Sequence, residues 1–178
     1  MAKILTLLAS NSTKSINRTL LTLVSQKITE HALTKVEVAD YPMPIYGIDT
    51  EEHDGFPEAV IQLRDIFAQH DAFIIASPEH NGSMPAVFKN TVDWLSRLAN
   101  ADNPIFGKKP VLLLSTSPGP NGGATNLKSL TQLMPWWGAD VKGSYSLGSF
   151  YENINDGLLS QTHDQALTAL INEFVGAL

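Results

Sequence analysis

The chain has 178 residues, of which 43% are hydrophobic and 17% charged, so it is long enough to bury a core and too apolar to be disordered. A net charge of −6 without any Lys/Arg-rich run disfavours nucleic acid as a partner. With no cysteine, disulfides, thiolate catalysis and Cys-ligated metals are excluded, which fits a reducing cytoplasm. No apolar run reaches transmembrane length, so we expect no membrane partner. A length of 178 residues predicts a single domain over residues 1–178.

The first apolar run, Ile4–Ala9, is too short for a signal peptide and predicts a buried strand. It is followed by the polar segment SNSTKSINRT at residues 10–19, where hydroxyl and amide side chains dominate. A helix follows, with Ser15 as its expected N-cap and Leu20, Leu21 and Val24 at helical spacing.

The alternating residues 36–40 predict a second strand with one solvent-facing side. The connection that follows, Tyr41–Gly55, carries two prolines and an acidic cluster. A connection of this length is uncommon in a compact domain unless it has a function. Pro57 then opens a second helix, whose buried side includes Val60 and Leu63.

The third strand, Ala72–Ala76, is a short, wholly apolar run. It leads into the loop Ser77–Ser83, in which a proline and an Asn-Gly pair are turn signals. Pro85 opens the next helix, whose apolar face includes Trp94. A strand, an elaborate polar loop and a helix in this order favour a ligand-binding loop, although an ordinary turn is the alternative.

The remaining chain repeats the pattern. Another apolar run, at 111–114, is followed by the glycine-rich loop 116–126 and by a helix over about 125–134. The alternating residues 141–147 predict a fifth strand, and apolar residues from Leu167 to Leu178 predict a C-terminal helix.

Five strand–helix units predict a parallel sheet between two helix layers, an α/β three-layer sandwich. The first, third and fourth strands are continuous apolar runs and belong inside the sheet, whereas the alternating second and fifth strands belong at its edges. The flavodoxin-like order 2-1-3-4-5 satisfies this, and it places the ligand site beyond the carboxyl ends of the first and third strands.

Three polar loops end the inner strands of this predicted sheet. The first leads into a helix N-terminus and lacks both the G-x-x-x-x-G-K-[ST] and the G-x-G-x-x-G pattern, so it suits a monophosphate held by neutral donors, or else it is only a polar helix cap. Gly82 lets a flat ligand approach the second loop, and Gly119, Gly122 and Gly123 form a further wall. A monophosphate joined to a flat ring describes flavin mononucleotide, FMN.

Nearly the whole sequence resembles the NADPH-dependent FMN reductase family. The family pattern P-E-Y-N-G-S-x-P-G-x-L-K-N-x-x-D-W-x-S-R matches residues 78–97, with His80 for Tyr, Ala86 for Gly and Phe88 for Leu. The pattern G-S-x-R-x-x-S-x-N-x-x-L is similar to residues 9–20, where Ser12 stands in place of the usual Arg.

The resemblance implies an FMN site made by three groups of residues, with no catalytic side chain and no metal. The phosphate group would be held by Ser10, Ser12, Ser15, Ile16 and Asn17. The isoalloxazine ring would be bordered by Pro78, Glu79, His80, Asn81 and Gly82. The third side would be closed by Ser115, Gly122 and Gly123.

The implied activity is transfer of hydride from NADPH or NADH to FMN, and then of electrons to a small-molecule acceptor such as a quinone, an azo dye or a flavin. The alternative is a flavodoxin-type one-electron carrier without direct NAD(P)H activity, although the ring-binding loops contain no aromatic side chain except His80. A receiver-like signalling domain would need acidic residues where Ser10 and Ser77 stand. The resemblance also implies a homodimer or homotetramer, with Tyr41–Gly55 and the Trp94 helix as candidate contacts.

Overall fold

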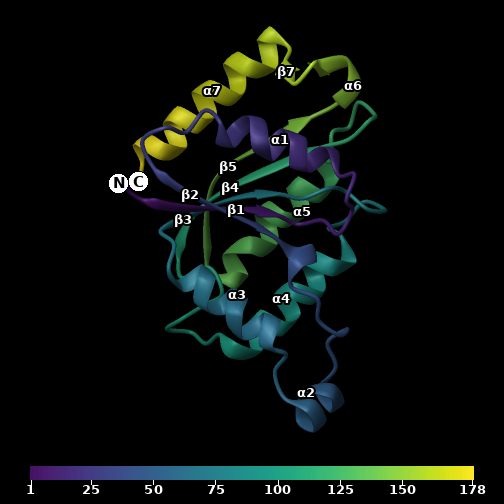
Figure 1. Ribbon diagram of the computed structural model, residues 1–178, viewed down its shortest axis with the longest axis vertical. Coiled ribbons are helices and arrows are strands. Elements are labelled where there is room, and N and C mark those ends of the chain that lie inside the picture. The colour runs from purple at the N-terminus through teal and green to yellow at the C-terminus, as the bar shows by residue number, and fades with distance from the viewer.

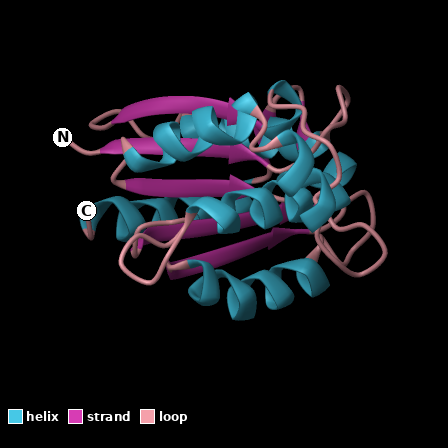
Figure 2. Cartoon of the chain, turned by 90° about the horizontal axis from the view of Figure 1, so that it is seen from below, coloured by secondary structure: helices cyan, strands magenta, loops and turns pink.

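The computed structural model describes residues 1–178 and contains a five-stranded sheet with all neighbouring strands parallel. Its strands are β1 (Lys3–Leu8), β2 (Ala32–Glu37), β3 (Ala72–Ala76), β4 (Lys109–Thr116) and β5 (Ala139–Leu147). Their order is β2-β1-β3-β4-β5, and Figure 2 shows all five arrows pointing the same way. The predicted order is therefore confirmed.

Helices cover both faces of the sheet (Figure 1), which confirms the three-layer sandwich. One face is covered by α1 (Ile16–Ser25) and α7 (Gln161–Gly176). The other is covered by α3 (Glu58–Ala68), α4 (Ala86–Leu98) and α5 (Ala124–Leu133). Each face has its own apolar core, because alternate side chains of the inner strands point to opposite sides.

Burial along the strands follows the predicted division between inner and edge positions. All of β3 is buried, as are five of the six residues of β1, whereas β2 and β5 include exposed positions. In a parallel sheet the carboxyl ends of all strands lie at one edge, so the loops after β1, β3 and β4 gather there.

The expected strand at 36–40 is wrong in its bounds, because β2 spans Ala32–Glu37 and Val38–Asp40 form a 3-10 turn, η1. The physical reason is the length of its neighbour. Parallel pairing runs from Lys3 beside Ala32 to Leu8 beside Glu37, and β1 ends there, so residues after Glu37 have no strand to pair with.

The connection Tyr41–Gly55 contains a short helix, α2 (Ile48–Asp54), that projects from the body of the molecule and has no buried residue (Figure 1). The connection is attached to α4. Trp94, which is fully buried, donates from Nε1 to the carbonyl of Pro44 at 2.8 Å. Arg97 pairs with Glu51 at 2.7 Å. Trp94 is therefore a core residue that supports this connection.

Short elements after β5 did not show in the sequence pattern: α6 (Phe150–Asn153) and a small hairpin of β6 (Ile154–Asn155) and β7 (Leu158–Leu159). Helix α7 begins at Gln161, ahead of its first buried apolar residue, Leu167. None of the helices combines the length and the hydropathy that crossing a membrane requires.

Candidate functional site

A cavity of about 300 Å³ lies among the loops that follow β1, β3 and β4. The first loop lines it with residues between Ser10 and Asn17, and the second with Pro78, Glu79 and His80. The other walls come from Thr116, Ser117, Pro118 and Tyr151. The structure thus brings the first predicted group together with Pro78, Glu79 and His80 of the second, whereas Asn81 and Gly82 of that group do not line the cavity.

The first loop offers hydrogen-bond donors that no protein atom uses. Helix α1 begins after Ser15, as predicted, but the Ser15 side chain makes no capping hydrogen bond. The backbone N–H groups of Ile16 and Asn17 have no acceptor in the protein. The hydroxyls of Ser10 and Ser12 accept from Ser12 N–H and Lys14 N–H, yet neither donates. Free N–H and O–H groups at a helix N-terminus form a site for an anion.

The side chain of Asn17 is turned away from this donor set. It is buried and forms two hydrogen bonds with the backbone of Thr116 at the end of β4. Only the backbone N–H of Asn17 therefore remains for a ligand. The side chain instead ties the start of α1 to the third loop.

The second loop ends in a tight hairpin turn. The N–H of His80 bonds to the carbonyl of Ser83 at 2.8 Å, and the reverse bond measures 3.0 Å. Asn81 and Gly82 between them have φ angles of 52° and 76°, which an Asn-Gly pair readily adopts. Their N–H groups have no acceptor in the protein. The turn therefore presents backbone donors on an open surface.

Glu79 and Asn126 connect the second loop to the third. The Glu79 carboxylate accepts the backbone N–H of Asn126 at 3.0 Å, in the first turn of α5. The Asn126 side chain donates to the carbonyls of Ser77 and Pro78, at 3.2 and 3.0 Å. Sequence reasoning did not single out Asn126, although a polar residue just inside a helix start was a usable signal.

The third predicted group lies differently from the first two. Ser115 is fully buried, its Oγ has no hydrogen-bond partner, and it sits under Gly123. Gly122 packs against Ser146 and Gly148 at the end of β5. Neither glycine nor Ser115 lines the cavity, whereas Thr116, Ser117 and Pro118 do. These three residues and Tyr151 were missed, and Tyr151 belongs to α6, which the sequence did not reveal.

Lys14 is the cation that lines the cavity, and Glu79 is the carboxylate there. A larger cavity, of about 470 Å³, lies at the amino ends of β4 and β5 beside Trp136 and Trp137. Lys108 is its only charged lining residue. The smaller cavity is therefore the one that combines free backbone donors, serine hydroxyls and a helix N-terminus.

These residues fit FMN. Neutral N–H and O–H donors suit its phosphate, and the exposed backbone of the Asn81–Gly82 turn suits a flat ring with hydrogen-bond acceptors on its rim.

Comparison with known proteins supports the same assignment. The model of the family described as NADPH-dependent FMN reductase matches residues 2–152. The chain belongs to the NADPH-dependent FMN reductase family. The expected family and its cofactor, FMN with NADPH or NADH as co-substrate, are thereby confirmed, as is an NAD(P)H-dependent oxidoreductase activity.

Individual relatives are similar over most of this chain. The quinone reductase of Escherichia coli K12 is 34% identical over 168 residues, covering 92% of this chain and 86% of its own. An uncharacterised protein of Mycoplasma pneumoniae is 32% identical over 155 residues, covering 86% of this chain and 91% of its own. Among solved structures, the flavoenzyme FerB, an NAD(P)H:(acceptor) oxidoreductase from Paracoccus denitrificans, superposes with a TM-score of 0.80 at 22% identity over 99% of this chain and 96% of its own. That structure supports the fold.

Proposed function

We propose that this family member binds FMN in the cavity at the ends of β1, β3 and β4 and reduces a quinone at the expense of NADPH or NADH. The observation that carries the proposal is the pair of free N–H groups, on Ile16 and Asn17, at the N-terminus of α1. Both residues line the cavity, which Ser10, Ser12 and Ser15 also line. Bound FMN supplies the redox chemistry, accepting hydride from the nicotinamide and reducing the acceptor.

The protein's own contribution is to bind and orient. The phosphate is held by neutral hydrogen bonds and by the dipole of α1. The donors are the two N–H groups and the hydroxyls of Ser10, Ser12 and Ser15. The N–H groups of the Asn81–Gly82 turn are available to acceptors on the ring. The Glu79 carboxylate caps α5, so it keeps the second loop in place and is not needed as an acid or base.

A quinone is the proposed acceptor because the E. coli relative, similar over 92% of this chain, is named a quinone reductase. The test is a steady-state assay of the FMN-loaded protein with NADPH or NADH and, in turn, a benzoquinone, an azo dye and free FMN. We expect the benzoquinone to give the highest kcat/KM. We also expect ping-pong kinetics, which appear as parallel lines in double-reciprocal plots. Faster turnover of the azo dye or of free FMN would contradict the choice of acceptor.

We also propose that copies of the chain assemble into a dimer or tetramer in the cytoplasm. The connection that carries α2 supports this, because Ile45 is 86% exposed and Ile48 is 50% exposed on a projecting segment. Light scattering on the FMN-loaded protein should give the mass of two or four chains. The replacement Ile45→Asp should lower that mass, and a monomer in the wild type would contradict the proposal.

A further inference from the structure

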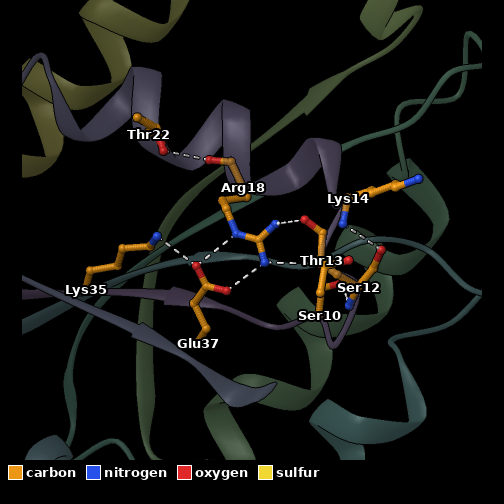
Figure 3. A network of polar contacts seen from close by, with 8 residues as sticks. All are labelled: Ser10, Ser12, Thr13, Lys14, Arg18, Thr22, Lys35 and Glu37. Carbon is orange, nitrogen blue, oxygen red and sulfur yellow. Dashed lines mark hydrogen bonds and ion pairs between the residues drawn. The ribbon is translucent and has the colours of Figure 1, made fainter. Parts of the chain in front are cut away.

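Arg18 forms a network behind the first loop (Figure 3). Its guanidinium donates to Glu37 twice, from Nε to Oε1 at 2.9 Å and from Nη2 to Oε2 at 2.7 Å. It also donates from Nη1 to the carbonyl of Thr13 at 2.8 Å and from Nη2 to the carbonyl of Ser12 at 3.1 Å. One side chain therefore fixes two consecutive carbonyls of the loop against the end of β2.

Fixing these carbonyls fixes the loop. A trans peptide unit is planar, so turning a carbonyl toward Arg18 turns the following N–H to the opposite side. The Ser12 carbonyl also accepts the N–H of Ser15 at 3.3 Å, which closes a tight turn before α1. Further along, the backbone N–H of Arg18 bonds to the carbonyl of Ser15 at 3.1 Å. The Arg18 side chain and backbone thus hold both ends of the turn that precedes the helix.

Glu37 is a rigid anchor for Arg18. It is the last residue of β2 and pairs in register with Leu8, the last residue of β1. The carboxylate side chain is only 13% exposed, and it also contacts Lys35 at 2.8 Å. The hydrogen bond from Arg18 lowers the pKa of Glu37 to about 2, so this carboxylate stays ionised at every pH near neutral. The carboxylate therefore keeps its charge, and its pairing with Arg18, at neutral pH.

Arg18 does not line the cavity beside Ser10, Ser12 and Ser15. It lies instead beside a separate surface hollow between α1 and β2, together with Thr22 and Lys35. Its guanidinium already makes four hydrogen bonds on that side. These bonds use four of the five guanidinium N–H groups, and the two to a charged partner are the stronger kind, so most of the capacity of Arg18 to bind a phosphate is already taken.

We propose that Arg18 is a positioning residue that, held by Glu37, pre-forms the loop Ser10–Asn17 for the phosphate group of FMN without contacting it. The proposal rests on the proposed function, because it concerns the same cavity. Ligand affinity rises when a loop is already ordered in its binding conformation, since binding then loses less conformational entropy. The competing arrangement is that Arg18 leaves Glu37 and binds the phosphate itself.

The two arrangements predict opposite effects of Glu37→Gln. If Glu37 anchors Arg18, its replacement loosens the loop and weakens FMN binding. If Arg18 is a phosphate ligand, the same replacement frees it and tightens FMN binding. Riboflavin, which has the same ring and no phosphate, separates an effect on the phosphate loop from an effect on the whole site.

The experiment measures dissociation constants for FMN and riboflavin by quenching of flavin fluorescence, with the wild type, Arg18→Gln, Glu37→Gln and the double variant. We expect each single variant to bind FMN about tenfold more weakly, riboflavin to bind unchanged, and the double variant to match the singles. Arg18→Lys should bind FMN more tightly than Arg18→Gln but more weakly than the wild type, because lysine keeps the positive charge but lacks the planar set of N–H donors of a guanidinium. The matched control is Arg64→Gln, which breaks an exposed pair with Asp65 on α3.

Three results would overturn the inference while leaving the proposed function in place: unchanged FMN affinity in both single variants, tighter FMN binding by Glu37→Gln, or an equal loss for riboflavin. A wild-type protein that binds neither flavin contradicts the proposed function itself, and this inference with it. Far-ultraviolet circular dichroism on each variant confirms that the compared proteins are folded.

Discussion

The side-chain amide of Asn17 pairs with the backbone of Thr116 through two hydrogen bonds, both 3.0 Å long, across 99 positions of sequence. Asn17 Nδ2 donates to the Thr116 carbonyl, and Asn17 Oδ1 accepts the Thr116 N–H. Both residues are buried. The start of α1 and the end of β4, which carry two walls of the cavity, therefore hold a fixed distance from one another.

Replacing Asn17 with alanine should lower the free energy of unfolding by about 1–3 kcal/mol, because a buried N–H and a buried carbonyl lose their partners. Urea denaturation followed by circular dichroism measures this loss. Asn11→Ala is the control, since Asn11 is exposed in the same loop and its side chain makes no hydrogen bond; its effect should stay within about 0.5 kcal/mol. Equal effects of the two replacements would show that the hydrogen bonds between Asn17 and Thr116 do not contribute to the free energy of unfolding.

Gly123→Ala should be among the most damaging single changes near the site. A Cβ there would overlap the Oγ of Ser115 and lie 2.8 Å from the Cβ of Ser115, at a φ of 79°. Overpacking and an unfavourable φ together should lower the free energy of unfolding by about 2–4 kcal/mol. Gly119→Ala is the matched control in the same loop, because no atom lies within 4 Å of its Cβ position.

The clash at Gly123 also has a rescue experiment. Ser115→Gly removes both contacting atoms, so the double variant should regain more than half of the loss, leaving the cost of the φ angle. Thermal denaturation of the four proteins would settle the point. A double variant as unstable as the sum of the singles would mean that the contact with Ser115 is not the cause.

Glu79 should act as a remote cap for α5. Gly123 occupies the N-cap position without a side chain, and the carboxylate of Glu79 supplies the missing acceptor for the Asn126 N–H. Glu79→Ala should therefore lower the free energy of unfolding by about 0.5–2 kcal/mol, and Glu79→Gln by less. Glu52→Ala, on exposed α2, provides the comparison in urea denaturation. Identical midpoints for the Glu79 and Glu52 alanine variants would contradict the capping role.

The ion pair of Arg18 and Glu37 predicts a pH dependence of stability. The Glu37 pKa is lowered from 4.5 to about 2, first by its hydrogen bond with Arg18, so the folded protein binds this proton more weakly than the unfolded chain does. Its contribution is complete above pH 4.5 and is lost as the pH falls toward 2. Compared with Glu37→Gln, the wild type should lose about 1–2 kcal/mol more between pH 6 and pH 2.5, after allowing for solvent screening.

Denaturant titrations of both proteins across this range provide the measurement. The Glu37→Gln variant has no carboxylate to protonate at position 37. The difference between the two pH curves of the free energy of unfolding therefore gives the contribution of Glu37 apart from that of the other carboxylates. If the two curves stay parallel down to pH 2.5, the ion pair does not contribute in this way.

Much of the fold followed from one physical rule, that strands inside a parallel sheet are buried on both faces. Continuous apolar runs such as Ala72–Ala76 therefore marked inner strands, and alternation marked edges. The bounds of β2 could not follow from this rule, because they depend on where β1 ends. The short elements β6 and β7 were missed because two-residue strands carry no periodicity.

The site was predictable where it depended on residue type and position after a strand. Hydroxyl-rich residues before α1 and the Asn-Gly turn could be located without coordinates. The direction in which a side chain points could not be predicted from the sequence. The burial of Ser115 under Gly123 and the contact of the Asn17 side chain with Thr116 were therefore not predicted. The role of Arg18 was hidden because Glu37, its partner, lies 19 positions away on a strand whose end was misplaced.

The central claim is that this chain holds FMN and reduces it with a nicotinamide. The most direct test loads the protein with FMN, removes oxygen, and records visible absorbance after adding NADPH or NADH. We predict that the bound flavin spectrum bleaches within the mixing time of a manual experiment with at least one donor. A flavin that binds but stays oxidised with both donors, and shows a stable semiquinone on dithionite titration, would contradict the claim and indicate a one-electron carrier.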